Sequence, residues 1–173
     1  MRLPASAHTS RPWRIHELRP GLSVEDVWEL PAQGAPEDFP RLVEVMTGWD
    51  PAKSSYVAVR ALFAIRFQVG RLLGWDGGSD APAPERFTPL CSADDEWAAE
   101  IENRTVQGVI HLGWVPDEGD LWRGQLAILV RRKGLLGRAY MAAITPFRHF
   151  VIYPLMLREL EREWKDPPKR AFP

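Results

Sequence analysis

The stretch that decides the fold is residues 96–131, EWAAEIENRTVQGVIHLGWVPDEGDLWRGQLAILVR. Within it apolar and polar side chains alternate, as is typical of half-buried strands, and two short polar segments interrupt the alternation. We predict strands over residues 96–102, 105–115 and 121–131, and a fourth strand over 138–144. Because the connections between them are short, neighbouring strands should pair antiparallel.

The turns between these strands predict which residues face each other, because antiparallel partners share a constant sum of residue numbers. A two-residue turn after residue 102 predicts that Trp97 faces Ile110. A turn centred on residue 118 predicts that Trp114 faces Trp122. Side-chain alternation then collects most apolar residues on one face of the sheet and polar residues on the other. The predicted sheet is therefore apolar on one side and solvated on the other.

The predicted apolar face has small residues near mid-strand and bulky residues near the strand ends. The small residues are Ala99, Gly108, Gly124 and Ala142, and the bulky ones are Trp97, Trp114, Trp122 and Tyr140. This pattern indicates a curved sheet with a hollow at its centre. An amphipathic helix over residues 146–165, kinked at Pro154, either packs into the hollow or bridges it and leaves a cavity.

The N-terminal half of the chain is interpreted from capping and turn signals. Residues 1–12 are small, polar and interrupted by proline, so we expect a loose segment followed by a single domain over 13–166. Residues 13–18 alternate weakly and predict a first strand, after which Ser23 caps a helical turn. Helices are expected over 38–46 and 54–73, and a Gly/Pro-rich loop over 75–84.

Composition narrows the class of protein. The 173 residues are 45% hydrophobic and 26% charged, as in ordinary globular domains, and the net charge of −1 gives no bulk attraction to nucleic acid or anionic membrane. The single cysteine, Cys91, excludes an intrachain disulfide and a multi-cysteine metal site. No apolar run approaches the roughly 20 residues of a spanning helix. We expect a cytoplasmic protein that binds neither nucleic acid nor membrane.

No familiar catalytic or cofactor-binding motif is present. The sequence has no G-x-S-x-G elbow, no H-E-x-x-H, no P-loop, and no G-x-G-x-x-G after a strand. We therefore expect no cofactor and no bound metal. His111 falls on the predicted polar face opposite Gln125, which favours a surface or hydrogen-bonded histidine. Cys91 is expected to be a small buried residue rather than a nucleophile.

Four polar residues could point into the hollow: Tyr140, Arg148, His149 and Tyr153. His149 and Tyr153 are four residues apart and so lie on one side of the predicted helix. Arg148 and His149 lie near the positive end of that helix, a placement that costs free energy unless an anionic group is near. This hints at an acidic partner, either a carboxylate of the protein or a ligand.

Two stretches resemble a bacterial family of unknown function within the START-like, polyketide-cyclase-like (SRPBCC) superfamily. They are FTPLCSADDEWAAEIENRTVQGVIHLGWVP (87–116) and AYMAAITPFRHFVIYPLMLRELEREW (139–164). The resemblance implies an α+β helix-grip domain, in which a curved antiparallel sheet wraps around a long C-terminal helix and short helices follow the first strand. It also implies a cavity for apolar or aromatic ligands between sheet and helix. Some members of that family are fused to a Rossmann-type NAD(P)-binding domain.

Three functions remain open at this point. The preferred one is binding of a small apolar or aromatic molecule, with a site formed by Trp97, Trp114, Trp122, Tyr140, Arg148, His149 and Tyr153. The second is an accessory module with a filled core, which pairs with a partner oxidoreductase or with a second copy as a homodimer. The third is a cofactor-free cyclase or dehydratase with His149 and Tyr153 as acid and base. Empty volume under the helix favours the first or third, and a filled core favours the second.

Overall fold

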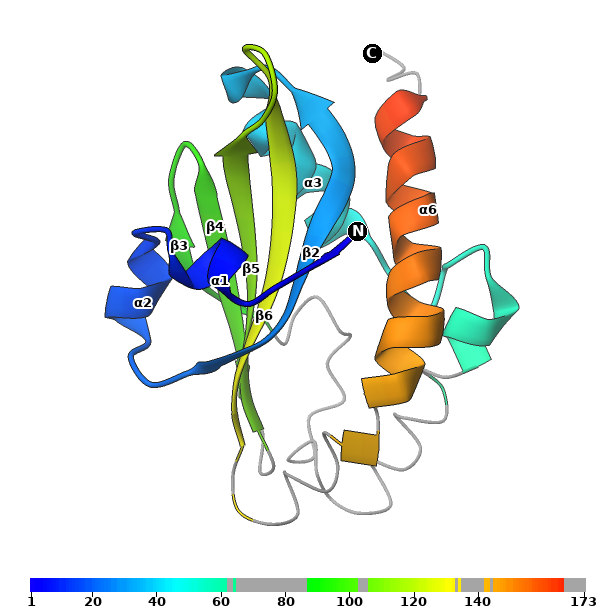
Figure 1. Ribbon diagram of the computed structural model, residues 1–173. Helices are drawn as coiled ribbons and strands as arrows, with labels where there is room; N and C mark the ends of the chain where they lie inside the picture. The colour runs from blue at the N-terminus through cyan, green and yellow to red at the C-terminus, as the bar shows by residue number, and fades with distance from the viewer. Residues whose placement is uncertain are drawn as a thin grey trace.

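The computed structural model describes residues 1–61, 64, 87–102, 106–132, 134, 142–143 and 145–166. Six antiparallel strands form one sheet in the order β1-β2-β6-β5-β4-β3 (Figure 1). The strands are β1 (Arg2–Leu3), β2 (Ser23–Gly34), β3 (Thr88–Ser92), β4 (Glu96–Glu102), β5 (Val106–Pro116) and β6 (Trp122–Arg132). The helices are α1 (Ser6–Thr9), α2 (Arg14–Leu18), η1 (Pro36–Asp38), α3 (Phe39–Gly48), η3 (Arg148–Ile152) and α6 (Tyr153–Lys165).

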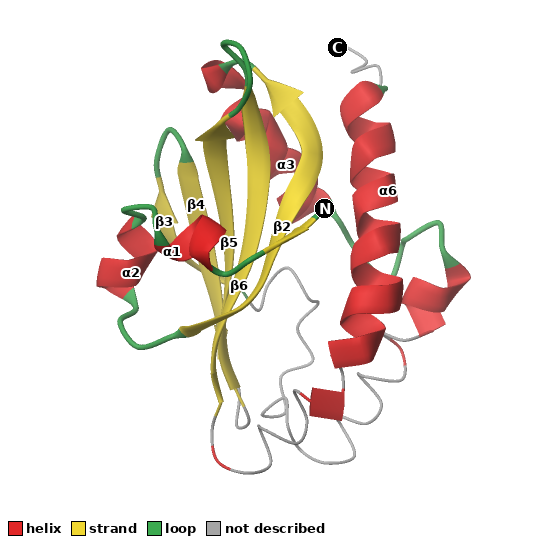
Figure 2. Cartoon of the chain, viewed as in Figure 1, coloured by secondary structure: helices red, strands yellow, loops and turns green. Residues whose placement is uncertain are grey.

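The sheet lies between two layers of helices (Figure 2). One side, which we call the inner face, packs against α3 and α6. The other side, the outer face, is covered by α1, α2 and the residues around them. The fold is thus α+β with an antiparallel sheet and a C-terminal helix, an arrangement compatible with a helix-grip domain.

The three central predicted strands are confirmed as β4, β5 and β6, but their register is shifted by two residues. Trp97 faces Leu112 rather than Ile110, and Trp114 faces Gly124 rather than Trp122. Glu102 faces Gln107, two residues beyond its predicted partner, and Pro116 faces Trp122, which centres that turn on residue 119 rather than 118. Because side chains alternate with a period of two, a two-residue slip leaves every residue on its predicted face. Trp97, Trp114 and Trp122 accordingly share the inner face.

On the side away from β5, β6 pairs with β2. The sequence instead predicted a helical turn capped by Ser23 at this position. The predicted strand over 138–144 is wrong at Ala142 and Ala143, which are helical, and its other residues, Tyr140 included, lie outside the described residues. Bulges between Val24 and Asp26 and between Glu29 and Gln33 interrupt the pairing of β2. They break the period of two that would have marked this strand in the sequence.

The outer face is covered rather than solvated. Residues 1–12, expected to be loose, contain β1, which pairs with β2, and α1, whose His8 is fully buried. Residues 13–18, predicted as a strand, form α2 instead. Glu96 on β4 accepts the backbone N–H groups of Arg14 and Ile15 at 2.8 and 2.9 Å, which satisfies the first turn of α2. This cap comes from a strand 81 residues away, so no local signal reveals it.

Four ionisable residues, the His8 cluster, lie beneath this covering layer: His8, His16, Glu96 and His111. His111 Nε2 lies 3.1 Å from Glu96 Oε1, and His111 Nδ1 lies 3.2 Å from His8 Nε2. An ionised Glu96 only accepts, so His111 donates to it through Nε2, and a neutral His111 accepts the Nε2–H of His8 at its Nδ1. His111 is hydrogen-bonded, as one of the sequence hypotheses held, but it is fully buried.

The middle of the inner face is filled. A Cβ atom built on Gly124 would lie 2.9 Å from Leu42 Cδ2 of α3 and 3.0 Å from Leu30 Cβ of β2. Helix α3 was predicted from Asp38-Phe39-Pro40, and its Phe39 and Leu42 are buried in the inner core. The hollow that the small mid-strand residues indicated is therefore occupied at Gly124 by these two leucines.

The C-terminal helix is confirmed, with a change of helical type before Pro154. Proline has no N–H for the Phe150 carbonyl, so a regular α-helix cannot continue through this point. Residues Arg148–Ile152 form a π-helix, in which Tyr153 N–H bonds to the Arg148 carbonyl. The π-helix η3 thus gives way to the α-helix α6 next to Pro154, where the sequence predicted a kink.

Further along α6, two contacts fix the helix against the rest of the fold. The Glu159 carboxylate accepts hydrogen bonds from Trp49 Nε1 at 2.8 Å and from the backbone N–H of Ser55 at 2.7 Å. Near the C-terminal end, Trp164 Nε1 donates to the Gln33 carbonyl at 3.1 Å. This bond satisfies a carbonyl of β2 beyond the short β1, where the edge of the sheet would otherwise be open.

The predicted helix over 54–73 is described from Val57 to residue 61, and Val57 itself is exposed.

The buried histidines predict acid sensitivity. Burial lowers the pKa of His8 from 6.5 to about 3, and burial also lowers the pKa of His111. Below pH 6.5 the unfolded chain takes up protons that the folded protein resists, so stability falls as the pH falls. Between pH 7 and pH 5 we expect His8 alone to remove about 2 kcal/mol of unfolding free energy, measured by urea denaturation at each pH.

A His8→Gln variant serves as the control for this pH effect, because glutamine keeps a donor near His111 but does not titrate. Its loss of stability between pH 7 and pH 5 should be clearly smaller than that of the parent protein. Equal pH dependence in parent and variant would show that His8 is not the buried neutral group described here.

The packing at Gly124 predicts opposite outcomes for two matched substitutions on the inner face. Gly124→Ala should cost about 1–3 kcal/mol, because the added methyl meets Leu30 and Leu42. Gly108→Ala should be neutral or stabilising by up to about 1 kcal/mol, because its nearest neighbour, Ile101 Cγ2, is 3.6 Å away. Urea midpoints measure both. Equal midpoints would contradict a filled core at Gly124.

Candidate functional site

The candidate site lies where β2 meets the start of the C-terminal helix. On β2, Asp26, Trp28 and Leu30 alternate onto the inner face, opposite Ile128 and its neighbours on β6. The π-helix η3 contributes Arg148 and His149, and α6 contributes Tyr153. We call Asp26, Arg148, His149 and Tyr153 the Asp26 cluster.

The Asp26 carboxylate is the acceptor at the centre of this cluster and is 2% exposed. Its Oδ1 lies 2.6 Å from His149 Nε2. Its Oδ2 lies 2.8 Å from Arg148 Nη2 and accepts the Tyr153 hydroxyl at 3.0 Å. Arg2 of β1 reaches Oδ1 from the other side at 3.7 Å. Both carboxylate oxygens are therefore engaged by donors from three different elements.

Aromatic rings form the second part of the site. The Trp28 ring centroid lies 4.8 Å from that of Tyr153 and 6.3 Å from that of His149. The Tyr153 and His149 rings stack with centroids 6.0 Å apart. Burial, reinforced by the charge of Asp26, raises the pKa of Tyr153 far above its usual value. Tyr153 consequently keeps its proton and acts as a hydrogen-bond donor.

Two donors around the Asp26 cluster have no acceptor. Arg148 Nε and Trp28 Nε1 are both buried and without a hydrogen-bond partner. A buried donor left unsatisfied costs about 1–3 kcal/mol, so such atoms are uncommon in folded proteins and need a physical reason. Here both atoms belong to residues that contact the same small group of side chains.

The structure brings together three of the residues proposed from the sequence: Arg148, His149 and Tyr153. The acidic partner that the helix position hinted at is a carboxylate of the protein, Asp26. The sequence missed Asp26 and Trp28 because β2 was predicted as a helical turn and a loop. An alternating apolar row on β2, interrupted by bulges, was the only signal that could have indicated them.

The tryptophans proposed for the site pack in or against the inner core. Trp114 is 1% exposed, donates from Nε1 to the Ala35 carbonyl at 3.0 Å, and packs near Phe39 and Trp164. Trp97 and Trp122 pack against the same core cluster. Tyr140 lies outside the described residues.

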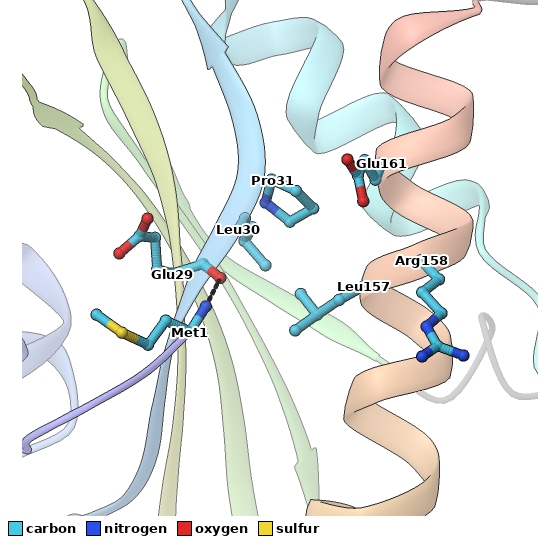
Figure 3. A pocket seen from close by; sticks show the side chains of 7 residues that line it. All are labelled: Met1, Glu29, Leu30, Pro31, Leu157, Arg158 and Glu161. Carbon is cyan, nitrogen blue, oxygen red and sulfur yellow. Dashed lines mark hydrogen bonds between the residues drawn. The ribbon is translucent and has the colours of Figure 1, made fainter.

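A separate shallow cleft of about 200 Å³ lies further along the same β2–α6 junction (Figure 3). It is lined by Met1, Glu29, Leu30, Pro31, Leu157, Arg158 and Glu161. Figure 3 shows the Met1 amino group bonded to the Glu29 carbonyl, with Arg158 and Glu161 projecting from α6. Its lining mixes apolar and charged groups and contains no buried polar atom without a partner.

The described part of the chain gives little support for a nucleophilic thiol, a metal site or a membrane-spanning helix. Burial, together with the charge of Glu96, raises the pKa of the Cys91 thiol to about 11, which disfavours a nucleophilic thiolate. In residues 1–61 and the later described segments, no three His, Cys, Asp or Glu side chains are arranged so that they could hold a metal ion. None of the helices in those same segments has the length and apolar character needed to cross a bilayer.

The Asp26 cluster predicts unequal costs for removing its members. Asp26→Asn should destabilise the protein by about 3–5 kcal/mol, because it leaves the largely buried Arg148 without a counter-charge. Tyr153→Phe should cost about 1–3 kcal/mol, since one hydrogen bond to a charged group is lost. Glu29→Gln, on the same strand but in a partly exposed pair with Arg123, should cost less than about 1 kcal/mol. Urea denaturation at pH 7 measures all three, and a similar small cost for Asp26→Asn would show that the cluster does not hold β2 to α6.

Comparison with known proteins places the chain in a family without assigning a function. No curated protein and no solved structure matches the chain. A family model described as a protein of unknown function (DUF2867) matches residues 18–155, which include strands β2 to β6 and the whole Asp26 cluster. The chain therefore belongs to the DUF2867 family.

Proposed function

We propose that this protein binds a small molecule with an aromatic or apolar body and at least one hydrogen-bond acceptor, and that the molecule is held at the Asp26 cluster. The site would lie at the junction of β2, η3 and α6. The START-like, helix-grip character suggested by the sequence resemblance is part of the same proposal, because a ligand between sheet and C-terminal helix is what that resemblance implies. A cytoplasmic location also belongs to the proposal, supported by the single free Cys91.

The observation that carries the proposal is the pair of buried donors without acceptors, Arg148 Nε and Trp28 Nε1. A carbonyl or carboxylate oxygen brought by a ligand would satisfy them and remove the cost of leaving them unpaired. A binding site of this kind combines a mainly apolar lining with a few polar groups that fix orientation. The rings of Trp28, Tyr153 and His149 would supply the apolar contact.

The proposed location differs from the one that the sequence suggested. The sequence placed the ligand over the mid-sheet residues Ala99, Gly108, Gly124 and Ala142. Leu30 and Leu42 occupy the space at Gly124, so the proposal moves the site toward Asp26. Tyr153 is a hydrogen-bond donor in it and not a catalytic base, because its pKa is raised.

A second function, an accessory module for a partner oxidoreductase, is favoured by one observation. The inner core is filled at Gly124 by Leu30 and Leu42, as expected of a domain that does not bind a ligand there. In that case the Asp26 cluster would serve only to hold α6 against the sheet, and its unpaired donors would be a tolerated cost. The two functions differ in whether a small aromatic molecule binds.

Binding of 2-acetylnaphthalene, an uncharged aromatic ketone, tests the proposal. Isothermal titration should detect binding to the parent protein. Trp28→Leu, which removes a ring and a donor, should weaken that binding at least tenfold. Trp164→Leu makes the same change near the other end of α6 and should leave the affinity within about twofold, since well-separated sites act independently.

The outcome separates the two functions. Absence of binding to the correctly folded parent would overturn the ligand-binding proposal and favour the accessory module. Equal weakening by Trp28→Leu and Trp164→Leu would place the bound molecule somewhere other than the Asp26 cluster.

A further inference from the structure

We infer that the ligand of the Asp26 cluster is an anion, with a carboxylate group on its aromatic or apolar body. This inference rests on the proposed function and specifies the chemical class of the molecule bound. It is drawn from the groups around Asp26: one carboxylate faces two arginines, and one N–H of Arg148 has no acceptor. In a purely structural ion pair the charges and donors would be matched.

The Asp26 cluster taken together with Arg2 has more positive than negative charge. Within the described part of the chain, Asp26 is the only carboxylate paired with either Arg148 or Arg2. One negative charge therefore faces two guanidinium groups, and His149 adds a further donor at 2.6 Å. Arg148 is only 13% exposed, so water screens its charge weakly. A second anion would complete the pairing of the two arginines.

Asp26 itself has no capacity left for a cationic or donor-rich ligand. Oδ1 is engaged by His149 and lies near Arg2, and Oδ2 is engaged by Arg148 and Tyr153. A ligand amine would meet these donors and two positive charges without a free acceptor. The electrostatics of the site thus favour an anion and disfavour a cation.

Arg148 is the residue that would recognise the carboxylate. Its Nη2 is paired with Asp26 Oδ2, while its Nε is buried and unpaired. Guanidinium groups bind carboxylates through neighbouring N–H groups, and such charge-assisted bonds are stronger than neutral ones. Arg2, whose side chain is 55% exposed, could reach a carboxylate bound beside Arg148 by a change of rotamer. Trp28 would then pack against the ring that carries the carboxylate.

Three probes of the same size and shape test the charge of the ligand. They are 1-naphthoate, 1-naphthalenemethanol and 1-naphthylmethylamine, which carry a negative, a neutral and a positive group on one ring system. At pH 7.5 and low salt, isothermal titration should give the tightest binding for 1-naphthoate. We expect its affinity to exceed that of the alcohol at least tenfold, and the amine to bind more weakly than the alcohol.

Two variants assign this preference to Arg148. Arg148→Gln should bring the affinity for 1-naphthoate to within about threefold of that for the alcohol. Arg148→Lys keeps the charge but loses the Nε donor, so it should retain part of the difference in affinity. It serves as the second variant should Arg148→Gln fail to fold. Arg158→Gln removes an arginine from α6 outside the cluster, beside the separate cleft, and should leave the preference unchanged.

Each result has a defined meaning. Equal binding of 1-naphthoate and the alcohol to the parent protein would overturn the anion inference while leaving the proposed function standing. No binding of any probe, 2-acetylnaphthalene included, would overturn both. A naphthoate preference that survives in both Arg148 variants but is lost in Arg158→Gln would move the anion to the cleft and overturn the inference for the Asp26 cluster.

Discussion

A single buried carboxylate on β2 joins the two ends of this fold. Asp26 forms an ion pair with Arg148 of η3, is hydrogen-bonded to His149 of η3 and Tyr153 of α6, and is approached by Arg2 of β1. A charged group that is 2% exposed is unfavourable unless donors surround it, so the position of the C-terminal helix is tied to this one side chain. The same requirement gathers in one place the groups from which we build the proposed ligand site.

Each face of the sheet contains a buried carboxylate that is saturated by donors from distant elements. On the outer face, Glu96 is saturated by His111 and by the first N–H groups of α2, and its pKa is lowered even though burial alone would raise it. That cluster holds the N-terminal segment to the sheet. On the inner face the Asp26 carboxylate is satisfied, but Arg148 Nε and Trp28 Nε1 are not. Unpaired buried polar atoms also occur on the outer face, at Trp13 Nε1 and His16 Nε2, so what sets the inner site apart is that its two unpaired donors lie beside a charged pair and stacked rings.

Much of the sheet could be predicted from the sequence because alternation is a local signal. It identified β4, β5 and β6 and placed Trp97, Trp114 and Trp122 on one face, although each pairing was shifted by two residues. The elements whose type was wrongly predicted from the sequence depend on distant partners. Helix α2 is capped by Glu96, and β2 is a strand because it pairs with β6 across bulges. Arg148, His149 and Tyr153 were found through helical spacing, whereas Asp26 could not be, since its strand was not recognised.

We place the proposed binding of a small aromatic acid beside Trp28, on the inner face of the sheet and away from the N-terminal covering layer. The indole N–H resonances of ¹⁵N-labelled protein report this directly, with Trp28 assigned through Trp28→Phe and Trp13 through Trp13→Phe. Titration with 1-naphthoate should shift the Trp28 resonance progressively and to saturation, because its unpaired Nε1 gains an acceptor, and should leave Trp13 unmoved. A saturating shift of Trp13 with Trp28 unchanged, or no shift of either, would contradict this placement.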